Sequence, residues 1–372
     1  MDFATDVPPY VAKPFELLPF RALMLAPARV GDPSSARALA RPYRDVAARL
    51  ATWIEEGRAV ADTAPALYVH EYTAAGLTVR GLVGALRMSR RTASPADRAV
   101  WPHEEIHPEQ AGELAERMHQ MDLNPAPILL VHHGEPQLRE VIADVTRAEP
   151  DWRYLDRSGQ RQRVWAIRDT EVLARIGTLL SDTRCLLADG HHRYAAYLRL
   201  QQEHPHTAWD AGLAMLVDQV DTPLFLGAIH RTLPGATLDA LVAAADEAGA
   251  EVTAHDRHRA LAALDSTHLV LTDGTTWLTV SPTDLDRDAA VSWLHERVLP
   301  LLPSPLPRIE HHHNVEDALA ATGGSSPAVL LPSPDFEQVR ALVEAGGLLP
   351  EKATSFQPKP SLGALMRPMT DG

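Results

Sequence analysis

Five consecutive residues near the middle of the chain combine charged groups, imidazole groups and a glycine. The apolar run 184–188 leads into DGHHR (189–193), and the residues that follow are strong helix formers. Glycine allows a positive φ and a close approach of the backbone to a ligand. The unpaired N–H groups of a helix start attract phosphate, and an arginine fork such as that of Arg193 fits a pair of phosphate oxygens. The order strand, glycine turn, helix therefore predicts a phosphate-binding turn.

The same turn has an ordinary structural interpretation. Asp189 would be the N-cap of the helix, and His191, His192 and Arg193 would lie on a solvated face. An isolated Asp-Gly pair favours that interpretation, whereas two histidines and an arginine behind it favour phosphate binding. Asp189 is also a candidate ligand of Mg²⁺, which commonly uses one or two carboxylates together with phosphate oxygens. Neighbouring residues diverge by about 100° around a helix, so the two histidines are not expected to chelate one metal.

A second cluster of ionisable residues lies in the segment PHEEIHPEQ (102–110). His103 is followed directly by Glu104 and Glu105, and a carboxylate beside a histidine is suited to take a proton from a substrate hydroxyl. The segment also precedes a helix expected over 111–122, where acidic residues stabilise the N-terminal end. The residues alone favour neither interpretation, and both stay open here.

These clusters depend on elements that alternate between helix and strand along the chain. The alternation predicts an α/β class with mixed sheets. The polar stretch 89–100 marks a first boundary, and we expect three regions, 1–100, 101–235 and 236–372. Residues 134–163 are polar and are expected to form an insertion. Helices are expected over 34–57, 111–122, 170–180, 193–204, 237–250, 290–302 and 335–347, and strands over 66–72, 77–88, 127–133, 184–188, 212–218, 268–280 (a hairpin) and 327–333.

Composition narrows the class of protein. The 372 residues carry a formal net charge of −14, and non-specific nucleic-acid binding requires the opposite sign. No nucleic-acid partner is therefore expected. The N-terminal segment lacks the pattern of a signal peptide and no run is long and apolar enough to span a membrane, so we expect a soluble cytoplasmic protein without a membrane partner. The single cysteine, Cys185, excludes a disulfide within the chain and fits a small buried apolar residue.

Three further polar segments are assigned to the surface. The run His311-His312-His313 lacks the spacing of a metal site and is expected in a surface loop. The pair His132-His133 ends the strand expected over 127–133 and is likewise expected at the surface without a metal. The segment LPEKATSFQPK (349–359) carries Lys352 and Lys359, which are able to bind phosphate or a carboxylate. Taken alone, however, this segment is best explained as a solvated tail.

The segment LLADGHHRYAAY resembles the second signature box of the ParB/sulfiredoxin-like superfamily, in which a Gly-x-x-Arg turn binds nucleotide phosphates. The chain as a whole resembles the DUF1015 family in a series of ordered blocks. These blocks are LPFRAL (18–23), ARPYRDV (40–46), LYVHEY (67–72), RGLVGALR (80–87), PHEEIHPE (102–109), NPAPILLV (124–131), VWAIRD (164–169), ADGHHRY (188–194), AIHRTL (228–233) and LPEKATSFQPK (349–359).

The blocks also resemble those of the free serine kinases of the ParB-like fold, which share the His-Glu-Glu segment, the DGHHR turn and a Lys/Thr closing segment in that order. The resemblance implies a ParB/sulfiredoxin-like core over 101–235, flanked by additional α/β regions. It implies a kinase that transfers phosphate between a nucleotide, ATP or ADP, and the hydroxyl of a small amino acid such as free serine, with Mg²⁺. The site residues that the resemblance implies are the base Glu104 or Glu105 with His103, the phosphate and Mg²⁺ site Asp189, Gly190, His191, His192 and Arg193, and the closing residues Lys352 and Thr354.

Within this resemblance we expect Glu104 to be the base, because it directly follows His103, and Glu105 to point away. We also expect Glu104 to face the DGHHR turn and the tail to lie against the same site. The closing block departs from the kinase pattern Lys-Ser-Thr-Tyr-Phe, since Ala353 and Ser355 flank Thr354. A changed acceptor is consistent with that departure.

Other functions fit the sequence less well. A nucleotide-binding switch of the ParB type needs DNA contacts, and the chain shows no basic helix-turn-helix. Sulfiredoxin-like repair needs a cysteine directly after the glycine of the turn, where this chain has His191. A scaffold with a vestigial site is the remaining alternative.

Overall fold

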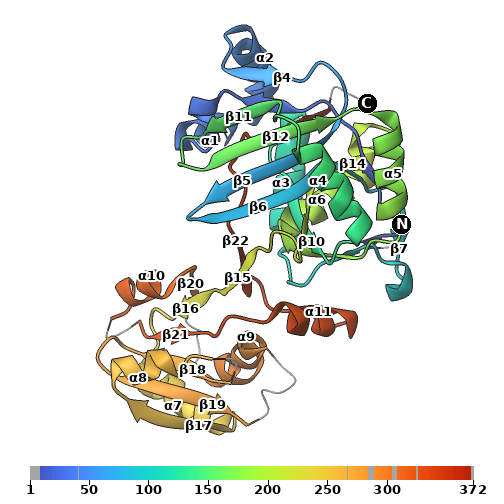
Figure 1. The fold of residues 1–372 in the computed structure, drawn as a ribbon. Helices are drawn as coiled ribbons and strands as arrows, with labels where there is room; N and C mark the ends of the chain where they lie inside the picture. The colour runs from blue at the N-terminus through green and yellow to red at the C-terminus, as the bar shows by residue number, and fades with distance from the viewer. Residues whose placement is uncertain are drawn as a thin grey trace, which may run out of the picture. The chain divides into compact units, whose positions relative to one another are not determined.

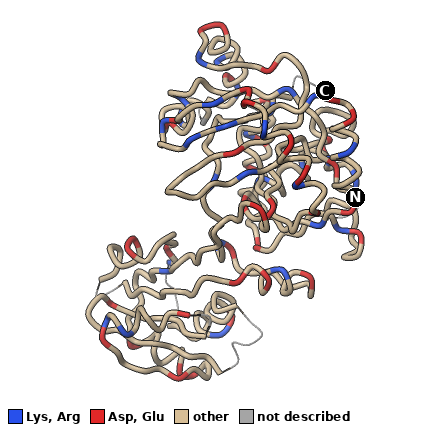
Figure 2. Tube along the Cα trace, in the orientation of Figure 1, with Lys and Arg blue, Asp and Glu red and all other residues tan. Residues whose placement is uncertain are grey.

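The computed structural model describes residues 9–40, 42–265, 267–283, 289–303, 308–323 and 326–369. The chain forms two compact units, each built from discontinuous segments. Unit 1 comprises the described residues of 1–102, 106–224 and 358–372, and unit 2 comprises 103–105 and the described residues of 225–357. Figure 1 shows the elements of both units, and Figure 2 shows acidic and basic residues interspersed along both traces.

Unit 1 is organised around a nine-stranded mixed sheet with the order β11-β12-β5-β6-β14-β10-β13-β8, and β2 pairs with β6. Strands β10 and β14 run parallel, as do β13 and β8, whereas the other neighbours are antiparallel. The strands of this sheet are β2 (Leu17–Leu18), β5 (Leu67–Ala74), β6 (Leu77–Arg87), β8 (Val100–Trp101), β10 (Ile128–His132), β11 (Trp152–Leu155), β12 (Arg161–Ile167), β13 (Cys185–Asp189) and β14 (Ala211–Asp218).

Helices and short strand pairs cover this sheet. Helices α4 and α5 pack on each other, and α4 also contacts β5 and β12; α3 packs on α6, which lies against β10 and β14. The helices of unit 1 are α1 (Pro33–Ala40), α2 (Val46–Glu55), α3 (Pro108–Met121), α4 (Pro136–Thr146), α5 (Thr170–Leu180) and α6 (His191–Glu203). The short strands are β1 (Tyr10–Val11), which pairs with β7 (Arg91–Thr92), β3 (Leu23–Leu25) with β4 (Ala59–Ala61), and β9 (Leu123–Asn124) with β23 (Arg367–Pro368).

The α/β class with mixed sheets is confirmed, but the chain is divided differently from the three expected regions. Residues 67–87 form β5 and β6 in the centre of the sheet that also contains β10, β13 and β14. Residues 1–100 are therefore not a separate region, because their strands complete the sheet of the following segment. Residues 134–163, expected as a polar insertion, contain α4 and β11 and the start of β12. Their polarity reflects strands at the sheet edge, where alternate side chains face solvent.

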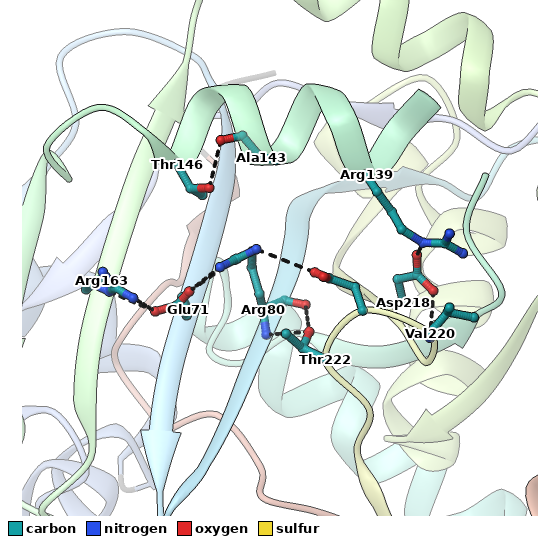
Figure 3. Close-up of polar contacts among 10 residues, drawn as sticks. Glu71, Arg80, Arg139, Ala143, Thr146, Arg163, Asp218, Val220 and Thr222 are labelled. Atoms are coloured by element: carbon teal, nitrogen blue, oxygen red, sulfur yellow. Dashed lines mark hydrogen bonds and ion pairs between the residues drawn. The ribbon is translucent and has the colours of Figure 1, made fainter. Parts of the chain in front are cut away.

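A buried carboxylate links three strands in the middle of this sheet. The Glu71 side chain on β5 is 2% exposed, and its two cross-strand neighbours are Arg163 on β12 and Arg80 on β6. Arg163 Nε donates to Glu71 Oε1 at 2.7 Å, and Arg80 Nε and Nη2 donate to Oε2 at 3.0 and 2.8 Å. Figure 3 shows Glu71 between the two guanidinium groups. Both carboxylate oxygens of Glu71 are therefore paired with guanidinium groups, which offsets the free-energy cost of burying its charge.

Unit 2 contains a six-stranded antiparallel sheet in the order β17-β19-β18-β21-β16-β20. A separate pair, β15 with β22, contains the closing block. The strands of unit 2 are β15 (Phe225–Ala228), β16 (His230–Thr232), β17 (Ala250–His255), β18 (Leu269–Thr272), β19 (Trp277–Pro282), β20 (Glu310–His312), β21 (Ala328–Leu330) and β22 (Thr354–Gln357). Its helices are α7 (Leu238–Glu247), α8 (Arg257–Ala262), α9 (Ala290–Trp293), α10 (Val315–Ala320) and α11 (Phe336–Glu344), and the expected helix over 290–302 continues after α9 as a π-helical turn, Leu294–Val298.

The strand expected over 127–133 is confirmed, but the surface position expected for the two histidine runs is wrong for His132, and the loop expected for His311 and His312 is a strand. His132 ends β10 and is buried, and burial lowers the pKa of its imidazole to about 4. His311 and His312 belong to β20, where His311 lies opposite Arg231 of β16. Both runs contain residues of a β-strand, and successive side chains of a strand point to opposite faces of the sheet. Within the described segments, every helix is too short or too polar to span a bilayer.

Candidate functional site

The DGHHR turn has the predicted arrangement of strand, glycine and helix. Asp189 is the last residue of β13, Gly190 has φ of 91° at the N-cap of α6, and Tyr194 N donates to Gly190 O at 2.8 Å. Because Gly190 offers no side chain, it leaves the first N–H groups of α6 without a side-chain cap from the N-cap position. Asp189 is therefore not the N-cap of the helix. The first turn of α6 has the polarity that favours an anion.

Asp189 holds two cations. Arg193 Nη2 donates to Asp189 Oδ2 at 2.6 Å, and Lys359 Nζ donates to Asp189 Oδ1 at 2.5 Å. Burial alone would raise the pKa of the Asp189 carboxyl, but the charges of Arg193 and Lys359 outweigh it and lower that pKa. One carboxylate and two cations leave a net positive charge at the turn. This balance suits phosphate.

The Arg193 guanidinium lies directly over Gly190. A Cβ at position 190 would lie 2.9 Å from both Arg193 Nε and Nη2, and 3.1 Å from a methyl group of Ile128. Arg193 Nε is buried and has no hydrogen-bond partner among the described residues. A buried donor without a partner is costly, which favours a ligand oxygen at this place. Glycine is thus required here both by its φ and by the close approach of Arg193.

Replacing Gly190 by alanine is expected to displace Arg193 and to weaken binding of a nucleotide at least tenfold, which calorimetric titration measures. A control is Gly159→Ala, since Gly159 has a similar φ of 84° but a Cβ added there would meet nothing within 4 Å. Both variants carry backbone strain of about 1–3 kcal/mol. If both retain wild-type affinity, the close contact with Arg193 has no role in binding.

Lys359 is held in place by its backbone. Tyr72 Oη donates to Pro358 O at 2.7 Å, and Gln160 Nε2 donates to Lys359 O at 3.2 Å. Tyr72 is fully buried in β5, so its hydroxyl is a rigid anchor. Taken alone, the segment 349–359 resembles a solvated tail, but Pro358 and Lys359 belong to unit 1. The contact of Lys359 with Asp189 agrees with the expectation that the tail lies against the DGHHR turn.

The two histidines of the turn lie differently. His191 is buried, with 8% exposure, and its proximity contributes to the lowered pKa of Asp189. His192 is partly exposed, and its Nε2 accepts a hydrogen bond from the backbone N–H of His107 at 3.1 Å. The rings of His107 and His192 also stack, with centroids 6.3 Å apart. His192 therefore ties the start of α6 to the start of α3.

The expected Mg²⁺ site at Asp189 does not fit this arrangement. Both of its Oδ atoms already accept hydrogen bonds from cations. No group of three or more His, Cys, Asp or Glu side chains able to hold a metal occurs in the portion of the chain that the structure describes. A divalent ion at Asp189 would therefore lie beside an ammonium group and a guanidinium group, whose like charge disfavours it.

The His-Glu segment and the closing block form a second cluster, within unit 2. The Glu104 side chain is 11% exposed, and its Oε1 accepts from Thr354 N at 2.9 Å and from Thr354 Oγ1 at 2.8 Å. Its Oε2 accepts from Lys352 N at 3.2 Å. His103 is fully buried, and its Nε2 lies 2.7 Å from Thr354 Oγ1. Four of the predicted residues, from segments about 250 positions apart, therefore meet.

Of two residues next to this second cluster, Glu105 lies outside it and Arg231 supports it. Glu105 is exposed, and its backbone N–H donates to Leu349 O at 2.9 Å. Arg231, which sequence reasoning missed, is completely buried and donates from Nη2 to Lys352 O at 2.9 Å. Its Nε also points to His295 Nε2 at 3.5 Å. Arg231 thereby holds the loop that binds the Glu104 carboxylate, and Glu104 is not a helix cap.

The two clusters belong to different units, so the expectation that Glu104 faces the DGHHR turn stays a prediction. Lys359 was a candidate phosphate-binding residue in the sequence, but its contact with Asp189 was not predicted, although one signal marked it. Only three of the 35 Lys and Arg residues are lysines, and Lys359 is one of them. Cys185 is buried in β13 and burial raises the pKa of its thiol, which confirms it as a structural residue.

Several solved structures are similar to this chain. The chain is similar to SbnI with a C-terminal truncation from Staphylococcus aureus, with 12% identity over 77% of this chain and 87% of that chain and a TM-score of 0.46. It is also similar to a free serine kinase variant in complex with ADP (15% identity, 72% and 89% coverage, TM-score 0.40) and to a conserved hypothetical protein from Pyrococcus furiosus (15%, 72% and 92%, TM-score 0.39). Likenesses at this level assign no activity.

No curated protein matches the chain. The family described as "Protein of unknown function (DUF1015)" matches residues 18–299, about three quarters of the sequence and including both the His-Glu segment and the DGHHR turn. The chain belongs to the DUF1015 family.

Proposed function

We propose that this protein is a nucleotide-dependent phosphotransferase that acts on the hydroxyl of a small amino acid such as free serine. The observation that carries the proposal is the DGHHR turn, where a helix start without a side-chain cap, a buried unpaired Arg193 Nε and two cations on Asp189 converge. The motif resemblance to the free serine kinases of the ParB-like fold supports the same function and a ParB/sulfiredoxin-like core.

In this proposal the turn binds the phosphates of ATP or ADP. Phosphoryl transfer depends mainly on positioning and on neutralising charge, because the protein makes few covalent contributions. The N-terminal N–H groups of α6 and the Arg193 guanidinium supply hydrogen bonds to phosphate oxygens. The nucleotide itself supplies the transferred phosphoryl group.

The proposed base is Glu104. It takes the proton from the acceptor hydroxyl as that oxygen forms a bond to the terminal phosphorus of the nucleotide. The bond from this phosphorus to the bridging oxygen breaks, so ATP leaves as ADP and ADP leaves as AMP. Thr354, Lys352 and the loop that Arg231 holds orient the Glu104 carboxylate. The hydroxyl and backbone N–H of Thr354 and the backbone N–H of Lys352 hold the Glu104 carboxylate in one orientation. His103, which contacts the same Thr354 hydroxyl, acts as a positioning residue.

The first test is binding and turnover with the wild-type protein. Calorimetry with ADP and ATP measures binding, and a transfer screen over serine, threonine and homoserine measures activity in both directions. We expect binding of at least one nucleotide and transfer to one hydroxyl amino acid. Binding without transfer to any acceptor would instead support a nucleotide-binding switch.

Arg193→Ala is expected to weaken nucleotide binding at least tenfold, because hydrogen bonds to charged groups contribute about 1.5–3 kcal/mol. The matched control is Arg199→Ala on the same helix, where Arg199 pairs only with the exposed Glu203 among the residues described. An unchanged dissociation constant for Arg193→Ala would remove the turn from the phosphate site.

A further inference from the structure

A lysine from a distant segment occupies the position at Asp189 where a divalent cation was expected. Lys359 Nζ lies 2.5 Å from Asp189 Oδ1, and Arg193 Nη2 lies 2.6 Å from Oδ2. The two cations thus approach opposite oxygens of one carboxylate. Lys359 is 170 residues away in the sequence from Asp189, so no local preference brings them together.

The placement of Lys359 is built into unit 1. The buried Tyr72 hydroxyl holds the carbonyl of Pro358, and Gln160 holds the carbonyl of Lys359 itself. Gln160 belongs to the turn between β11 and β12, so two elements of the main sheet fix this short segment. A lysine needed only for solubility would require no such anchoring, because its backbone position would not matter.

The ammonium group of Lys359 has capacity for a ligand. An ammonium carries three N–H donors, and Asp189 is the acceptor of one of them. The Lys359 side chain is 41% exposed, so it is accessible to a ligand from solvent. Arg193 offers further donors at the same carboxylate, including the buried Nε without a partner in the described structure. Asp189 therefore positions the Lys359 and Arg193 side chains toward a ligand, instead of binding a metal ion that would accompany the phosphate.

We propose that Lys359 is a phosphate-binding residue of the DGHHR turn and supplies there, through its ammonium group, the positive charge that a Mg²⁺ ion at Asp189 would otherwise supply. Asp189 is then a positioning residue for Lys359 and Arg193, not a metal ligand. The ligand class is a nucleoside di- or triphosphate, so this inference rests on the proposed function. A lysine serves as a compact point charge for phosphate, whereas arginine acts as a planar fork.

The chain is suited to a direct test, because its only lysines are Lys13, Lys352 and Lys359. A lysine-specific acylating reagent followed by peptide mass spectrometry reports each of them separately in the intact protein. We expect ADP or ATP, added with EDTA, to lower the labelling rate of Lys359 at least fivefold and to leave Lys13 unchanged. Mg²⁺ added without nucleotide is expected to change no lysine.

Substitution gives a second measurement on the same residue. Lys359→Met is expected to weaken nucleotide binding at least tenfold in calorimetry with EDTA present, and Lys359→Arg is expected to restore part of the loss. Lys13→Met serves as the control and should bind as the wild type does. A merely structural tie between Lys359 and Asp189 would lower thermal stability in Lys359→Met but leave the dissociation constant unchanged.

Three results would overturn the inference. In the first, nucleotide binds by calorimetry but Lys359 is not protected. In the second, Mg²⁺ alone speeds the labelling of Lys359, which means that the metal displaces the ammonium from Asp189. In the third, Lys359→Met binds nucleotide as tightly as the wild type. If the wild-type protein binds neither ADP nor ATP, the proposed function itself fails. That outcome is distinct from the three above, because it is measured on the wild-type protein alone.

Discussion

Glu104→Gln is expected to lower the rate constant of phosphoryl transfer by about 10²–10⁴-fold, the usual contribution of a general base. The amide cannot accept the proton of the acceptor hydroxyl. In wild-type Glu104, Oε1 accepts from Thr354 and Oε2 accepts from the backbone N–H of Lys352. The NH2 group of the glutamine side chain would replace one of these oxygens and would therefore face a donor. Single-turnover kinetics with saturating nucleotide separate the chemical step from binding.

Nucleotide affinity is expected to remain within about twofold of the wild type in Glu104→Gln, because Glu104 is not one of the proposed phosphate-binding residues. Glu105→Gln is the matched control: the same substitution one residue later, on an exposed side chain, should leave the rate unchanged. Thr354→Val tests the alternative that Glu104 only anchors the loop. If Thr354→Val and Glu104→Gln lose the same stability and the same small amount of activity, Glu104 is a structural residue.

Glu71→Gln is expected to reduce the free energy of unfolding by about 3 kcal/mol, toward the lower end of the range for breaking a buried ion pair. The substitution keeps the volume but removes the charge between Arg80 and Arg163, which then face each other across β5. The cost is at the lower end because the Arg163 side chain is 47% exposed and can turn to water. Urea denaturation followed by circular dichroism measures the change.

The control for this prediction is a glutamate in an exposed pair. Glu113 on α3 pairs with Arg117 four residues later, and its side chain is 63% exposed. Glu113→Gln should change the free energy of unfolding by no more than about 0.5 kcal/mol. Equal effects of the two substitutions would show that the Arg163–Glu71–Arg80 arrangement contributes no more than a surface pair.

Local features of this protein follow from its sequence. The helix expected over 170–180 coincides with α5, and the strands expected over 66–72 and 77–88 correspond to β5 and β6. The DGHHR turn was predictable for the same reason: the apolar strand, the glycine and the helix formers are adjacent, so their interactions are local.

Features that depend on pairing between distant segments were not predictable. The polar segment 134–163 resembles a loop, and only its pairing with β5 shows that it extends the main sheet. Glu71 and His70 are polar residues inside an apolar-looking strand, and their partners on β12 are set by register, not by spacing. The contacts of Lys359 with Asp189 and of Arg231 with Lys352 were not predicted, because each joins segments more than 100 residues apart.

The discontinuous composition of unit 1 has a consequence for protein synthesis. Ala364, Leu365 and Met366 are buried in unit 1, and Arg367 Nη1 donates to Ala211 O at 2.8 Å. A ribosome translates the whole of 225–357 before these residues appear, which takes on the order of ten seconds. During that interval the nascent unit 1 lacks part of its core. It also lacks Lys359, whose ammonium group binds Asp189 Oδ1. The apolar surface of unit 1 that Ala364, Leu365 and Met366 cover is therefore completed only after the segment beginning at Pro358 leaves the exit tunnel.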